Sequence, residues 1–378
     1  MKTRHSDKEK SMKNISDNNT SNRARRLYLN VSALQSFPYS NPNRDKTGAP
    51  KGHLYGGTWR QFITSQCIKK AMRDYFGTWF DDETLRTSDT VPYLCECVAK
   101  EANISEAEAE KYVLKFTKPS KAFGKEGKGE NNMFYSRAQF DGIVDLVLRS
   151  YMEDPKNVSK ENIKEFRNRI AKLPSATQIL FGRMIALDKD LAYDGACQFA
   201  DAFTVNEARL EPDLFIVVSD PLREGEKKRG GAYLDTRLGA SGTYYRYANI
   251  NLSTGSELFR HENLSAAKVC AQFVEAFVKA VPTGMIHSHA HCTIPDRLIV
   301  ELRDAAVNYC PAFEKAITSR QGYAKEASLR LDSYKADVDR IYGEPLAQWD
   351  MNELSLNEIK KQIEEEVERR TGNGGTCA

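Results

Sequence analysis

The chain has 378 residues, long enough for one large domain with insertions or for two compact domains. Hydrophobic residues make up 40% of it, enough for a substantial core, while the formal net charge of +3 does not by itself identify a partner. No stretch approaches the roughly 20 apolar residues that cross a bilayer, so we expect a cytoplasmic protein without a membrane partner. The eight cysteines include no CxxC pair, which disfavours a zinc site and favours reduced thiols.

The first segment, residues 1–26, is polar and carries eight Lys or Arg residues against three Asp or Glu residues. It lacks the apolar stretch of a signal peptide. We predict a disordered basic arm that either touches nucleic acid or is simply solvated.

The next segment begins with an alternation of apolar and polar residues over 27–32, a period of two that predicts a half-buried strand. Prolines and glycines over 37–57 predict a loop. A helix is expected over 63–76, with Thr64 or Ser65 as its N-cap.

Residues 81–190 differ in residue pattern from the segments before and after them and are predicted to be mainly helical. Ser105 and Glu108 fit the capping box of one of these helices. Glycine and lysine crowd residues 118–129, which predicts a mobile loop. The segment therefore looks like a helical insertion.

Strand patterns return over 214–218, 243–250 and 298–302. Between the last two, residues 265–280 predict a helix, and the charged tail over 352–370 predicts another. A strand, a helical insert, and then mixed strands and helices together indicate an α+β fold with an embedded helical domain.

The strongest sign of chemistry is the window from Lys46 to Arg73, which contains no Asp or Glu in 28 positions. Cations in it alternate with Tyr55, Trp59 and Phe62, and its glycines let backbone N–H groups approach a ligand closely. Phosphate oxygens are held by cations, short donors and helix N-termini, and aromatic planes stack exposed bases. The alternative is a solvated basic face, but so long an acid-free window favours nucleic acid.

A histidine-rich stretch contains His287, His289 and His291, which on a strand would share one side and could bind a transition metal. Because only Cys292 and Asp296 could add ligands at a helpful spacing, we expect a polar loop or surface cluster and no metal. GxSxG, HExxH and P-loop motifs are absent from the sequence, and nothing pairs two carboxylates for acid–base catalysis. We therefore expect no enzyme and no cofactor.

Several blocks carry a resemblance that covers most of the chain outside the arm and the helical insert. In chain order they lie at 33–38 (ALQSFP), 43–45 (NRD), 55–57 (YGG), 64–73 (TSQCIKKAMR), 181–184 (FGRM), 241–252 (SGTYYRYANINL) and 276–284 (AFVKAVPTG). In these blocks the chain resembles the CasC-type backbone subunits of the type I-E CRISPR surveillance complex, Cascade, of the RAMP-like superfamily. Independent blocks in register are far more specific than one short motif.

The resemblance implies a hand-shaped α+β protein. Its parts would be an RNA-recognition-motif-like palm with an antiparallel sheet (27–80, 191–208 and 241–378, including a C-terminal helix), a helical finger (81–190) and a β-hairpin thumb (209–240) with a charged tip (223–229). In the family, copies stack head to tail along a CRISPR guide RNA, with large, small and repeat-end-binding subunits as further partners. Each thumb displaces one nucleotide, and the remaining nucleotides pair with target DNA.

The resemblance also implies site residues. Positions matching guide-binding residues of the family are Arg44, Lys51, Thr64, Ser65, Gln66, Lys69, Arg73, Arg183, Met184 and Arg246. Met184 would pack beside a base, and Phe215 and Leu234 would be the wedge residues of the thumb. Contacts to the RNA backbone read no bases, as a subunit that serves any guide requires.

Two other interpretations stay open. Related backbone subunits of type III complexes cut target RNA with one acidic residue in the loop after the first strand, where this chain has Asp45. The alternative for Asp45 is that it caps or orients the turn beside Asn43 and Arg44. A further interpretation is a stand-alone RNA-binding protein that stays monomeric on long RNA.

Overall fold

The computed structural model describes residues 26–127, 132–185, 188–217, 233–253, 256–259 and 264–371. Within this part, a nine-stranded antiparallel sheet has the order β11-β10-β1-β9-β7-β3-β2, and β6 and β8 pair with further stretches of β9. Its strands are β1 (Tyr28–Ser40), β2 (Gly52–Tyr55), β3 (Thr58–Ile63), β6 (Cys197–Phe199), β7 (Ala202–Thr204), β8 (Glu211–Val217), β9 (Tyr233–Asn251), β10 (Arg297–Arg303) and β11 (Ala347–Asp350). The α+β fold with a large antiparallel sheet is thus confirmed.

The centre of the sheet is formed by β1, which lies between β9 and β10. Successive side chains of a strand point to opposite faces, and both faces are buried here. Leu29 and Val31 belong to the core on one face, and Leu34 belongs to the core on the other. This explains why nearly the whole strand is buried.

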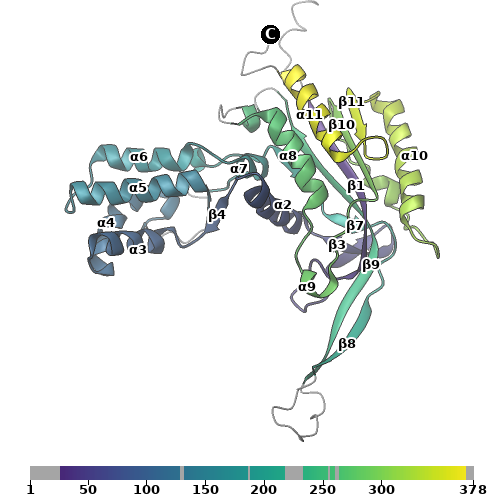
Figure 1. The fold of residues 1–378 in the computed structure, drawn as a ribbon, viewed down its shortest axis with the longest axis horizontal. Helices are drawn as coiled ribbons and strands as arrows, with labels where there is room; N and C mark the ends of the chain where they lie inside the picture. Colours follow the sequence, from purple (N-terminus) through teal and green to yellow (C-terminus); the bar gives the residue numbers. More distant parts are fainter. Residues whose placement is uncertain are drawn as a thin grey trace, which may run out of the picture.

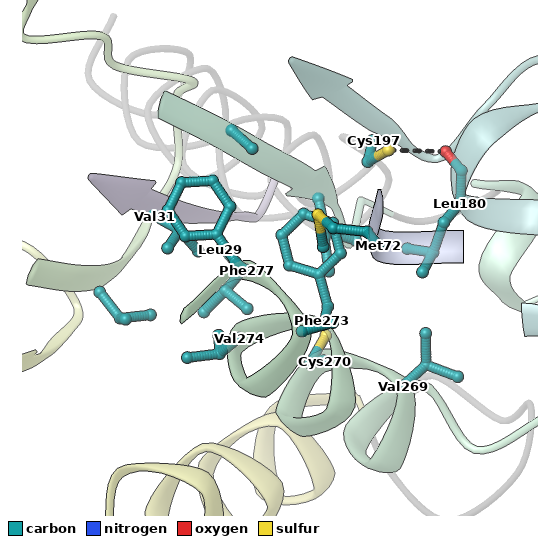
Figure 2. Close-up of a cluster of buried hydrophobic side chains, with 14 of the residues drawn as sticks. Leu29, Val31, Met72, Leu180, Cys197, Val269, Cys270, Phe273, Val274 and Phe277 are labelled. Carbon is teal, nitrogen blue, oxygen red and sulfur yellow. Dashed lines mark hydrogen bonds between the residues drawn. The ribbon is translucent and has the colours of Figure 1, made fainter. Parts of the chain in front are cut away.

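Helices cover both faces (Figure 1). Helix α8 (Ala266–Lys279) lies on one face with α11 (Leu356–Thr371) packed beside it, and α10 (Ala324–Tyr342) covers the other. Figure 2 shows Phe273 and Phe277 of α8 against Leu29 and Val31 of β1. The sheet therefore offers no open face of the kind that binds RNA in an isolated RNA-recognition motif.

A helical region extends sideways from the sheet (Figure 1). It contains α3 (Thr90–Ala102), α4 (Glu106–Thr117), α5 (Arg137–Glu153) and α6 (Lys160–Ala171), with a two-stranded sheet of β4 (Thr84–Thr87) and β5 (Met133–Ser136). These elements share a hydrophobic core of their own.

The chain returns to the large sheet through α7 (Ala176–Phe181). The carboxylate of Asp82 accepts hydrogen bonds from the N–H groups of Ala176 and Thr177, both at 2.9 Å, and so caps α7 from the start of the helical region. Short 3₁₀ helices lie at Lys121–Phe123, Lys189–Leu191, Glu257–Phe259 and Cys310–Phe313.

Beyond the sheet, β8 and the first part of β9 form a projecting two-stranded hairpin (Figure 1). Most of its side chains are exposed. The predicted charged tip at 223–229 lies outside the described residues, as do residues 1–25 of the basic arm predicted over 1–26.

Most local predictions are confirmed with shifted ends. The helix expected over 63–76 is α2 (Ser65–Trp79) with Thr64 as its N-cap, and the capping box of Ser105 and Glu108 is present. The loop expected over 37–57 is wrong in part, because β1 continues to Ser40 and β2 lies within it. In the described part, no helix combines the length and apolar character needed to cross a membrane.

Candidate nucleic-acid interface

Helix α2 organises the candidate interface, and its first turn is already held by the protein. The Thr64 side chain accepts a hydrogen bond from the N–H of Cys67 at 3.4 Å, and the Thr64 N–H donates to Asn43 at 3.0 Å. The N–H of Ser65 donates to the carboxylate of Asp201 at 2.6 Å. Because a carboxylate occupies this end, a phosphate would meet the side chains of α2 before its first N–H groups.

One side of α2 borders a cavity of about 510 Å³, here named the loop cleft. It is lined by residues 42–46 and Gly48, by residues 282–284, and by Cys67, Lys70, Ala71 and Asp74 of α2. Its cations come from Arg44, Lys46 and Lys70, and the charge of Lys51 also acts on the Cys67 thiol at its edge. Lys70 is paired with Asp74 at 2.5 Å, so the loop cleft is basic but not free of carboxylates.

The other side of α2 borders a cavity of about 580 Å³, here named the Met184 cleft. Gln66, Lys69 and Arg73 line it from α2, and Met184 faces it from the chain after α7 with 87% of its surface exposed. Phe134 of β5 adds an aromatic ring. This combination of an amide, cations, a thioether and a ring suits a sugar–phosphate chain that carries exposed bases.

Aromatic rings position two cations of the Met184 cleft. The Lys69 ammonium lies 5.5 Å from the centre of the Phe199 ring, and the Arg73 guanidinium lies 6.0 Å from that of Phe134. Such contacts orient a cation without neutralising it. The charge of Lys69 therefore stays available for phosphate, while Arg73 also forms a long ion pair with Asp74 at 4.0 Å.

Two of the predicted RNA contacts, Arg183 and Arg246, are each only 3% exposed, although Arg183 also borders the Met184 cleft. The Arg183 guanidinium donates to the carbonyls of Leu191 and Ile170 at 2.9 and 2.8 Å. The Arg246 guanidinium donates to the Gln35 side chain and, at 2.7 Å, to the carbonyl of Phe277. Burial lowers both pKa values, that of Arg246 to about 10. Both arginines join parts of the fold.

Asp45 lies in an exposed turn, and one oxygen of its carboxylate closes that turn. Its Oδ1 accepts hydrogen bonds from the Thr47 hydroxyl at 2.6 Å, the Thr47 N–H at 2.7 Å and the Ala49 N–H at 3.2 Å. The Thr47 hydroxyl is the main reason that the pKa of this carboxyl lies below its usual range. This geometry matches the interpretation of Asp45 as a turn cap.

The two residues expected to form a wedge lie on opposite faces of the hairpin. Leu234 is paired with Ile216 and Phe215 with Asp235, and directly paired residues of antiparallel strands share a face. The Leu234 face also carries Leu214 and is aliphatic and exposed. On the other face, the Arg237 guanidinium lies 4.1 Å from the centre of the Phe215 ring.

The histidine-rich stretch is not a strand. His287 and His289 lie on the one-turn helix α9 (Ile286–His289), while His291 is fully buried and its Nε2 lies 2.8 Å from the carbonyl of Pro282. Among the described residues, no cluster of three His, Cys, Asp or Glu side chains could hold a metal ion.

Some residues of the interface were missed. Lys46 and Lys70 lie in the acid-free window, so that pattern could have included them. Arg86 and Phe134 reach the Met184 cleft from β4 and β5. No local pattern connects these strands with α2, so only the tertiary structure reveals them.

Comparisons with known proteins identify the family of the chain. A family model for CT1975-like proteins matches residues 29–372. The chain belongs to the CT1975-like protein family. A chain from a structure described as "CRISPR RNA-guided surveillance complex, pre-nicking" is similar to it, with 26% identity, a TM-score of 0.73, and coverage of 91% of this chain and 100% of that one.

A second similar structure, described as "CRISPR RNA-guided surveillance complex", has 23% identity, a TM-score of 0.55, and coverage of 91% of this chain and 99% of that one. At this identity the similarity shows the fold alone. A search among curated proteins found no match.

Proposed function

We propose that this chain is a non-catalytic backbone subunit of a type I-E Cascade surveillance complex, which polymerises along a CRISPR guide RNA. The observation that carries the proposal is the similarity, over the full length of the other chain, to a member of a CRISPR RNA-guided surveillance complex. The sequence blocks described above support the finer assignment to type I-E. The two basic clefts beside α2 supply a surface that suits the task.

In this proposal the guide backbone crosses α2, between the loop cleft and the Met184 cleft. Arg44 and Lys51 hold phosphates on one side, and Lys69 and Arg73 hold them on the other. Thr64, Ser65 and Gln66 lie between them on the first turn of α2. These groups recognise charge and backbone geometry, so any guide sequence is accepted and pairing with target DNA supplies the specificity.

The large sheet would be the palm, the helical region the finger, and the β8–β9 hairpin the thumb. Phe215 and Leu234 stay the proposed wedge, with separate contacts because they lie on opposite faces. A thumb that displaces one nucleotide needs a neighbouring copy, which is why we propose head-to-tail assembly with the other Cascade subunits at its ends. Asp45 has a structural role in this account, and no residue cuts RNA.

The proposal is tested by mixing the purified protein with single-stranded RNAs of increasing length and measuring particle masses. A backbone subunit gives masses that rise with RNA length in steps of one protein chain, 42.7 kDa. A stand-alone RNA-binding protein leaves particles of one chain at every length. Full-length RNA recovered after incubation supports the non-catalytic role, and fragments lost on Asp45→Asn would contradict it.

A further inference from the structure

The β2–β3 hairpin presents two large apolar side chains to solvent. Leu54 is 68% exposed and Trp59 is 40% exposed, and the two face each other across the strands. They lie within the acid-free window but outside both clefts. Because the two side chains are directly paired across the strands, they form one exposed apolar surface within the acid-free window.

Strand alternation places Trp59 on the same face of the sheet as α2. Ile63 of β3 belongs to the core beneath α2 together with Ile68 and Met72, whereas Phe62 belongs to the core on the α10 side. Because side chains alternate along a strand, Trp59 shares its face with Ile63. At about 3.3 Å per residue, Trp59 lies roughly 17 Å along the strand from the cap of α2. In Figure 1, β3 lies between α2 and the projecting hairpin.

The platform under these side chains is rigid. The buried Arg60 guanidinium donates to the carbonyls of Thr204, Phe313 and Glu314 at 2.8, 3.1 and 3.0 Å. At the turn, Gly56 has a positive φ, and a Cβ there would lie only 1.7 Å from the carbonyl oxygen of Glu314. The hairpin is therefore fixed before any ligand arrives, which reduces the entropy lost on binding.

The indole itself has a defined place. A Cβ built on Gly52 would lie 2.7 Å from the Trp59 ring, so the ring occupies the space that this glycine leaves open. The Trp59 carbonyl accepts a hydrogen bond from the N–H of Ala208 at 2.8 Å, which ties the Trp59 backbone to the chain entering β8. Lys51 comes just before β2, and one acidic and one basic exposed residue, Glu207 and Arg209, flank Ala208.

From this geometry we propose that Trp59, supported by Leu54, is a stacking platform for an unpaired base of single-stranded RNA. The inference rests on the proposed function, because it extends the RNA path from α2 toward the projecting hairpin. A base suits this surface, because every base has an aromatic face and its phosphates can meet the cations of the acid-free window. Stacking distinguishes no bases, in keeping with a protein that accepts any guide.

Tryptophan fluorescence tests the proposal directly. The chain has three tryptophans, of which Trp349 is buried and Trp79 is 67% exposed at the far end of α2. In a Trp79→Phe protein, the exposed indole that remains among the three is Trp59. Oligouridine RNA should quench its emission, whereas heparin, a polyanion without bases, should bind and leave the emission unchanged.

Affinity gives the second measurement. Trp59→Ala should weaken oligouridine binding about 5- to 150-fold, the range for one lost stacking contact, and leave heparin binding unchanged. Trp79→Ala, a matched loss of an exposed indole, should change neither. Equal quenching by heparin, or wild-type affinity of Trp59→Ala for oligouridine, would overturn the platform. A wild-type protein that binds no RNA would contradict the proposed function together with the platform. A wild-type protein that binds RNA as tightly as Trp59→Ala would contradict the platform alone.

Discussion

Replacing Lys69 with Gln removes one cation from the Met184 cleft while keeping a side chain of similar reach. The Lys69 ammonium rests against the Phe199 ring, 5.5 Å from its centre, so among the described residues its removal leaves no carboxylate without a partner. For single-stranded RNA, one lost phosphate contact lowers the slope of log K against log salt by about 0.7. Relative to equal binding of the two proteins at 1 M salt, this difference in slope makes the variant bind about fivefold more weakly near 0.1 M salt and roughly 25-fold more weakly near 0.01 M.

The assay is a salt titration of affinity for several RNAs of equal length and different sequence. Lys325→Gln is the matched control, because Lys325 is exposed on α10, which covers the other face of the sheet. It should leave both affinity and slope at the wild-type values. A Lys69→Gln effect confined to certain RNA sequences, or an unchanged slope, would refute the assignment of Lys69 to a phosphate.

Further predictions concern the turn, the hairpin and two buried side chains. Asp45→Ala should leave RNA uncut, as in the wild-type complex, and an RNA-cleaving activity present only with Asp45 would promote the nuclease alternative. Replacing Phe215 and Leu234 with Ala should leave RNA affinity largely intact but remove the regular spacing of nucleotides in a chemical footprint of the bound guide; matching footprints would count against the thumb. Arg246→Met should reduce the free energy of unfolding by about 2–6 kcal/mol, because two buried oxygens each lose a donor, and urea unfolding measures this. Burial lowers the pKa of His291, so its contribution to stability is complete above the unfolded pKa near 6.5 and is lost as the pH falls toward the folded pKa. His291→Phe should therefore show a smaller loss of urea stability between pH 7.5 and 5.5 than the wild type does.

The local structure around α2 could be predicted from the sequence because short-range rules determine it. Thr64 has the side chain of an N-cap, and Gln66, Lys69 and Arg73 follow at helical spacing on one face. The predicted loop before α2 was too long because its prolines and glycines suggested an early end of β1. In the structure, Pro38 falls where the register of β1 against β9 shifts, a place at which no ladder N–H is required.

Arg246 shows a signal that was present but not used. Arg246 lies on the same face of β9 as Tyr244, Ala248 and Ile250, which are two or four residues away from it. All three are buried against α8. The period of two in the sequence therefore predicts that Arg246 lies in the core, where hydrogen bonds satisfy the donors of its guanidinium group. Arg183 offered no such pattern, because its partners lie on a helix and a short turn.

The Met184 cleft could not be predicted as a unit. Arg86 and Phe134 belong to strands about 50 residues apart, and their meeting with α2 depends on how the helical region packs. Helix α10 was also missed, although its burial of Leu331 and Val338 against the sheet closes the face that an RNA-recognition motif leaves open.

The most direct test is the native mass of the protein purified from cells, with its bound nucleic acid extracted and sequenced. The account predicts a large particle with several copies of this chain and RNAs of uniform length that end in repeat-derived sequence. A protein that stays a monomer without RNA, even when produced together with the products of neighbouring genes, would contradict it.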